Sequence, residues 1–127
     1  MDFGMDNSKI QQAMSQPFDI TIPAGESFFF ETTIKQSSEP NAQPINLAGF
    51  TAVGQLREDW DKPLLASFEI TFLLPRTTGK IRFVLSDEVT RALPVSRARY
   101  DIFVTDQEGT TRKLLEGIAF ITRNISR

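Results

Sequence analysis

The residues of this chain that could do chemistry are mainly carboxylates. Glu58, Asp59 and Asp61 stand together in one charged loop, and Asp101 follows Tyr100 in a strand-like segment. Two carboxylates about 5 to 10 Å apart across a cleft can hydrolyse a glycosidic bond when the pKa of one of them is raised. Three carboxylates in one short loop are more typical of a solvated turn, so we predict no glycosidase site there.

The same carboxylates could instead hold a metal ion or an ion pair. Asp59 and Asp61 could offer oxygens to calcium, but their spacing lacks the graded ligand pattern of an EF-hand loop. Asp101 could pair with Arg57 or Arg99, or accept a hydrogen bond from a loop, as most carboxylates in sheets do. We therefore expect a structural role for Asp101 and no metal site in the loop.

The composition lacks the side chains that most enzymes use. The 127-residue chain contains no His and no Cys, and these supply the commonest neutral-pH base, thiolate nucleophiles and transition-metal ligands. A serine nucleophile would need a base from a Lys or a carboxylate, and nothing in the sequence suggests such an arrangement. We predict that the protein is not an enzyme and uses no cofactor.

Charge and hydropathy argue against two classes of partner. A net charge of -2 and a pI near 5.1 give no long-range attraction to phosphate, so we expect no nucleic-acid partner. No apolar run approaches the roughly 20 residues of a membrane-spanning helix. The acidic N-terminus lacks the basic start and apolar stretch of a signal peptide. We therefore expect no membrane partner and no secretion.

The elements that must position these residues are short strands. Apolar and polar residues alternate in seven segments that are separated by turn residues such as Gly25, Gly79 and Gly109, and this period of two is typical of half-buried strands. Ser86 suits the N-cap of one helical turn before Pro94. The pattern predicts an all-β fold, an antiparallel Ig-like β-sandwich of about seven strands with one short helical turn. The seven segments are 18–22, 26–35, 50–57, 67–73, 80–85, 99–106 and 110–123.

The chain divides into an N-terminal arm, residues 1–16, and a β-sandwich domain, residues 17–127. Apolar residues of the arm have no visible core to join, so they either contact another subunit or belong to a frayed end. Phe29 falls on the polar side of its strand, and Trp60 lies in the charged loop. The predicted interface residues are Phe3, Met5, Ile10, Met14, Phe29 and Trp60.

Trp60 also supports a second hypothesis. It is the only Trp of the chain, and an aromatic ring in a loop of a β-sandwich can stack on a pyranose, as in the carbohydrate-binding modules of a receptor-binding apparatus. Sugar-binding platforms usually combine several Trp and Tyr, whereas Trp60 stands alone in its loop. Packing of the ring over the sandwich edge or in a subunit contact is the competing interpretation, and both stay open.

An ordered series of blocks along the chain resembles a family of tailed-bacteriophage structural proteins. The family includes the N-terminal domain of baseplate upper proteins, and the blocks together cover about residues 18–125. Each block alone is only a strand and a turn, so the specificity comes from their order. The blocks are FDITI at 18–22, AGESF at 24–28, PINLAGFTA at 44–52, QLR at 55–57, GKIRFVLS at 79–86, TRAL at 90–93, YDI at 100–102, LLEG at 114–117 and ITR at 121–123.

The resemblance implies an Ig-like β-sandwich, a place in the virion at the tail or baseplate, and no reaction. It also implies synthesis in the host cytoplasm and assembly into trimers or larger rings, with other phage structural proteins as partners. Larger adaptors of the family carry a C-terminal extension that reaches the fibre, whereas this sequence ends at Arg127, soon after the last predicted strand. We therefore expect a wedge, collar or cementing role rather than a fibre-holding one.

Overall fold

The computed structural model describes residues 2–4, 16–37, 39 and 41–123, which form ten strands, one short α-helix and one 3-10 turn. Neither helical segment is long and apolar enough to cross a membrane. The helix is α2 (Asp87–Ala92), and the turn is η1 (Arg76–Thr78). The strands are β1 (Asp2–Gly4), β2 (Gln16–Pro17), β3 (Ile20–Pro23), β4 (Phe28–Lys35), β5 (Thr51–Arg57), β6 (Leu64–Ser67), β7 (Glu69–Phe72), β8 (Lys80–Leu85), β9 (Arg97–Thr105) and β10 (Thr111–Thr122).

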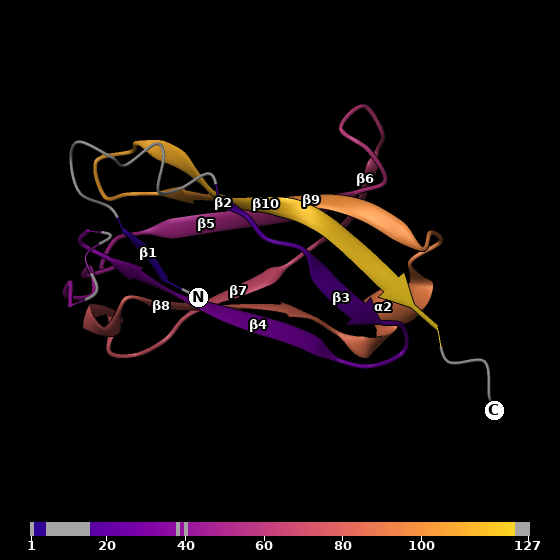
Figure 1. The fold of residues 1–127 in the computed structure, drawn as a ribbon, viewed down its shortest axis with the longest axis horizontal. Coiled ribbons are helices and arrows are strands. Elements are labelled where there is room, and N and C mark those ends of the chain that lie inside the picture. Colours follow the sequence, from indigo (N-terminus) through magenta and orange to yellow (C-terminus); the bar gives the residue numbers. More distant parts are fainter. Residues whose placement is uncertain (1, 5–15, 38, 40, 124–127) are drawn as a thin grey trace.

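The strands form two sheets that lie one above the other (Figure 1). One sheet has the order β1-β4-β8-β7, and the other has the order β2-β10-β9-β5-β6, with β3 also paired to β10. The arrangement of β4, β8 and β7 in one layer against β10, β9, β5 and β6 in the other is that of an immunoglobulin-like sandwich. The predicted all-β, Ig-like fold is therefore confirmed.

The core lies between the two sheets and is built around aromatic rings. Tyr100 and Ile102 of β9 are fully buried and point toward the opposite layer. Phe30 of β4 approaches from that layer, with its ring centroid 4.9 Å from Phe83 and 6.3 Å from Tyr100. Burying apolar surface in this way contributes roughly 25 cal/mol per Å². One core therefore holds both sheets together.

The N-terminal strands differ from the antiparallel prediction. β1 pairs in parallel with β4, and β2 and β3 pair in parallel with β10, while the other pairings are antiparallel. Two parallel strands cannot be joined by a short hairpin, so the chain must cross over before it pairs in parallel. The edge of β10 that faces away from β9 offers the backbone N–H and C=O groups with which β2 and β3 pair. The segment predicted at 67–73 also splits, because the chain changes sheets at Phe68 between β6 and β7.

The predicted arm, residues 1–16, lies only partly within the described residues. Its residues 2–4 form β1, in which Phe3 is in register with Ile34 of β4, and Gln16 begins β2. Met5, Ile10 and Met14 lie outside the described residues. The boundary between arm and domain stays a prediction, although part of the arm adds a strand to the first sheet.

Local sequence signals account for the ends of several elements. Ser86 caps α2, as predicted, and its Oγ accepts a hydrogen bond from the Val89 N–H at 3.3 Å. The turn between β9 and β10 contains Gly109 with φ 88°, where Asp106 Oδ1 accepts two backbone hydrogen bonds. A glycine within a strand predicts a close approach, and a Cβ on Gly54 would lie 3.0 Å from the Phe68 ring.

Two polar contacts fasten the irregular segments to the sandwich. The Tyr100 hydroxyl donates to the Phe18 carbonyl, between β2 and β3. Thr90 of α2 is fully buried; its Oγ1 accepts from the Gly25 N–H at 3.0 Å and donates to the Glu26 carbonyl at 2.8 Å. Buried backbone groups must find partners, so these side chains hold the connections next to the core.

Candidate interaction surface

The outward side of β9 carries the charged and aromatic residues of the candidate site. Arg97, Arg99, Asp101 and Phe103 alternate with buried residues, so their side chains point away from the core. The neighbouring strand β10 places Ile118 opposite Arg99 on the same side. The outer side of the six-stranded sheet therefore presents charges beside apolar side chains rather than a uniformly polar surface.

A β-bulge brings two further charged residues to this side. The register of β10 against β9 shifts between Lys113 and Leu115, and both Leu114 and Leu115 are fully buried. Three residues apart in a regular strand, Lys113 and Glu116 would point to opposite sides, but the extra residue of the bulge aligns them. Their side chains form an ion pair with Nζ and Oε1 3.0 Å apart.

Trp60 covers part of this outer side. It belongs to the loop 58–63 between β5 and β6, and its ring lies 5.6 Å from the Arg99 guanidinium carbon and 5.8 Å from Lys113 Nζ. The same Lys113 Nζ is 5.6 Å from the Phe103 ring centroid. We name this surface the Trp60 face, and its members are Trp60, Arg97, Arg99, Asp101, Phe103, Lys113, Glu116 and Ile118.

One carboxylate fixes the position of the loop. Asp59 Oδ1 accepts a hydrogen bond from the Trp60 N–H at 2.8 Å and lies 3.3 Å from Arg99 Nε. Exposed ion pairs contribute little to stability by themselves. Here the pair joins the loop to β9, and it holds the Trp60 ring close to the sheet while 46% of the residue stays exposed.

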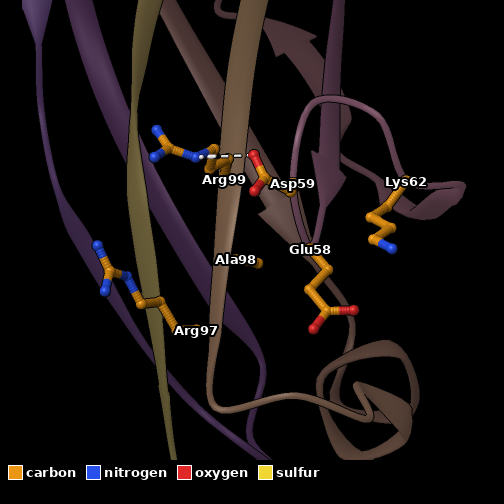
Figure 2. A pocket seen from close by; sticks show the side chains of 6 residues that line it. All are labelled: Glu58, Asp59, Lys62, Arg97, Ala98 and Arg99. Atoms are coloured by element: carbon orange, nitrogen blue, oxygen red, sulfur yellow. Dashed lines mark ion pairs between the residues drawn. The ribbon is translucent and has the colours of Figure 1, made fainter.

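Two hollows adjoin the Trp60 face, and Arg99 lines both. The smaller, of about 280 Å³, lies beside the Trp60 ring. The larger, of about 370 Å³, lies between the loop and β9 (Figure 2). The smaller hollow is lined by Pro17, Asp19, Trp60, Arg99, Glu116, Gly117 and Ile118, and the larger by Glu58, Asp59, Lys62, Arg97, Ala98 and Arg99.

Asp101 is a member of the Trp60 face whose carboxyl pKa is shifted by its surroundings. Partial burial raises the pKa of its carboxyl, and the charges of Lys113 and Arg57 oppose this by lowering it. The neighbouring carboxylate of Glu116, directly across from Asp101 in the register, raises the pKa further. Desolvation and like charge both disfavour the ionised form of the Asp101 carboxyl.

The structure separates the two predicted interface residues that it describes with their side chains. Phe29 is 60% exposed on the outer side of the four-stranded sheet, where the Arg82 guanidinium carbon lies 5.3 Å from its ring. Arg82 also pairs with Glu31 at 2.6 Å. Trp60 lies on the opposite outer side, so these two aromatic residues cannot belong to one continuous patch.

The predicted carboxylate roles have different outcomes. Asp101 has neither predicted ion-pair partner among the described residues: Arg99 pairs with Asp59, and Arg57 reaches Gln55 at 3.0 Å. For Arg99 the reason is geometric, because the loop carries Asp59 back over β9. Within the described parts of the chain, no group of three or more His, Cys, Asp or Glu side chains could hold a metal ion.

Sequence reasoning missed the contribution of β10 to the surface. A strict period of two places Lys113 and Glu116 on opposite sides of the strand, so their ion pair was not predicted. The available signal was the Leu114-Leu115 dipeptide within an otherwise alternating strand, since two consecutive apolar residues can mark a bulge when one face is buried.

No protein-family model matches the chain, and no curated protein matches it.

Proposed function

We propose that this chain is a structural subunit of a phage tail or baseplate that acts through protein–protein interfaces and catalyses no reaction. The single observation that supports the proposal is the Trp60 face, in which a half-exposed Trp is flanked by two cations on a two-layered sandwich. Trp and Arg are the residues that most often dominate interface energies. The blocks that resemble phage structural proteins supply the virion context.

In this proposal the sandwich is a rigid block within the virion, and its partners are copies of itself and other tail, baseplate or neck subunits. Residues 1–16 are the first candidate for inter-subunit contact, because β1 and β2 both lie at sheet edges, where neighbouring chains can join. The loops at 36–46 and 58–63 are the next candidates. Of these, the loop 58–63 carries Trp60.

The proposal is tested by the assembly state of the purified chain and of a variant that lacks residues 1–16. We expect light scattering coupled to gel filtration to give a multiple of 14.3 kDa for the full chain and a smaller assembly for the variant. The melting temperature should change little, because only three residues pair in β1 and one is lost from β2. Unfolding of the variant would place the arm in the core and contradict its docking role.

A second candidate function is carbohydrate binding, and the hollow of about 280 Å³ beside the Trp60 ring favours it. A pyranose could stack on the exposed part of the ring while hydrogen bonding to Asp19 or Glu116. A glycan array tests this with Trp60→Ala, and Phe29→Ala is the matched control because it removes an exposed ring from the opposite side. A monomer that binds glycans only through Trp60 would reverse the order of the two candidates.

A further inference from the structure

The carboxylates around the two hollows are almost all engaged by neighbouring groups. Asp59 accepts from the Trp60 N–H and pairs with Arg99. Asp19 Oδ1 accepts from the Ile118 N–H at 2.9 Å. Glu116 pairs with Lys113. These acceptors therefore have less capacity to bind a cationic ligand than their number suggests.

The cations around the same hollows keep more of their hydrogen-bonding capacity. Among the described residues, Arg97 and Lys62 have no ion-pair partner, and Arg99 uses only its Nε, which leaves its two terminal nitrogens. In Figure 2, Arg97 and Arg99 extend from β9 on one side of the hollow, while Glu58 and Lys62 come from the loop on the other. The larger hollow is lined by two carboxylates, Glu58 and Asp59, and by three cations, Lys62, Arg97 and Arg99, so its lining has an excess of one positive charge.

We infer that the Trp60 face binds an acidic segment of a partner protein. This inference rests on the proposed function, because it names the surface and the partner chemistry of one protein–protein interface. An apolar side chain of the segment would pack on the exposed part of the Trp60 ring. Carboxylates on either side of that side chain would accept from Arg99 and Arg97, and charge-assisted hydrogen bonds of this kind are the strong ones.

The positions of the cations favour an acidic segment over a neutral saccharide. A sugar ring and an apolar side chain could both use the exposed part of the Trp60 ring, but only a charged ligand also gains from Arg99 and Lys113, which lie within 6 Å of that ring. A carboxylate is attracted by these cations, whereas a neutral sugar forms no charge-assisted hydrogen bond of equal strength with them. The attraction is local, because the whole chain carries a net charge of -2, and salt should therefore weaken it strongly.

The test uses the only Trp of the chain as a reporter, since its indole N–H gives a single resonance in a ¹⁵N correlation spectrum. The full chain is titrated with a hexaglutamate peptide, a hexalysine peptide and an oligogalacturonate. We expect hexaglutamate to shift the Trp60 indole resonance at low salt, and the shift to disappear in 0.5 M NaCl. Hexalysine should have no effect. Preference for hexalysine, or a response to oligogalacturonate alone, would overturn the inference.

Two variants test the role of the cations. Arg97→Gln with Arg99→Gln should weaken hexaglutamate binding about tenfold or more, because two charge-assisted hydrogen bonds are lost. Arg82→Gln is the matched control, since Arg82 also pairs with a carboxylate and lies over an aromatic ring, but on the opposite outer side. Equal affinity of the double variant and of the Arg82→Gln control for hexaglutamate contradicts the inference. Lys62→Gln, which changes no ion pair within the described chain, should give a smaller loss and covers the case in which the double variant does not fold.

Failure of this inference and failure of the proposed function are distinguishable. The assembly state of the full chain depends on all of its interfaces, whereas the indole titration reads the Trp60 face alone. A chain that assembles but does not bind hexaglutamate keeps the structural role and loses this surface as the acidic-segment site. A monomeric chain that binds hexaglutamate supports the surface and removes the homo-oligomer.

Discussion

Gly117 of β10 allows the backbone at Phe18, between β2 and β3, to pack directly against β10. A Cβ at this position would overlap the Phe18 carbonyl, which accepts the hydrogen bond of the Tyr100 hydroxyl. The glycine is therefore required by the close approach of two backbones, and its φ is not in the left-handed region. The segment that connects β2 with β3 can reach β10 only because this position lacks a side chain.

We predict that Gly117→Ala lowers the free energy of unfolding by about 2 to 3 kcal/mol, because the added methyl group forces Phe18 away from β10. Urea denaturation measures the loss. Adding Tyr100→Phe to this variant should cost much less than Tyr100→Phe costs alone, since the hydrogen bond is already broken. Strictly additive losses would show that Gly117 and Tyr100 act independently.

Asp101 gives a pH dependence whose sign follows from its raised pKa. The folded state holds the proton more tightly than the unfolded state, so stability from this group is present at low pH and decreases as the pH rises through the unfolded and then the folded pKa. We predict that Asp101→Asn raises the melting temperature at pH 7 and that its advantage disappears below about pH 4. An advantage that grows on acidification would contradict this account.

Among the elements, α2 is hydrogen-bonded to the turn between β3 and β4 through one hydroxyl. Thr90 is fully buried and bonds both the Gly25 N–H and the Glu26 carbonyl, so it holds the turn between β3 and β4 against the helix. Without it, two backbone groups near the core would need other partners. The helix has only six residues, which is too short to be stable without tertiary contacts.

We predict that Thr90→Val, which keeps the shape of the side chain, lowers the free energy of unfolding by about 2 to 3 kcal/mol through the unsatisfied backbone groups. Thr90→Ser keeps the hydroxyl and should lose about 1 kcal/mol, mainly from the missing methyl group. Chemical denaturation of the two variants compares them directly. If valine is tolerated as well as serine, packing rather than hydrogen bonding secures α2.

The sequence predicts most of the regular elements because their signals are local. Alternation along β9, with Tyr100 and Ile102 inward, and the capping residue Ser86 each depend on a few neighbouring residues. The parallel pairing of β3 with β10 could not be predicted in this way, because it joins residues about a hundred positions apart. The change of sheet at Phe68 is also decided by tertiary packing, against Gly54.

The candidate site was less predictable than the fold for the same reason. Trp60 and Asp59 stand out in the sequence, but nothing local shows that their loop folds back over β9 to reach Arg99. The bulge at Leu114 and Leu115 then decides which charges of β10 face outward. A surface built from one loop and two strands depends on register and bulges, and composition does not determine either of them.

The parallel pairing of β3 with β10 determines how the molecule resists a pulling force. β3 and β10 run in the same direction, with Ile20 opposite Ala119 and Pro23 opposite Thr122. A pull on the chain before Ile20 and after Thr122 therefore acts along the strands in opposite directions. The hydrogen bonds between them lie across the force, so they must yield together instead of opening one at a time.

We expect single-molecule force spectroscopy to give a high unfolding force for this pulling direction. A much lower force is expected when the attachment points are Ser67 of β6 and Thr21 of β3, at the two edges of the same sheet, because the strands are then peeled apart sequentially. Equal forces in the two directions would contradict this. The parallel strands β3 and β10 thus make the sandwich a shear-loaded link, suited to transmitting tension lengthwise between whatever is joined at its two ends.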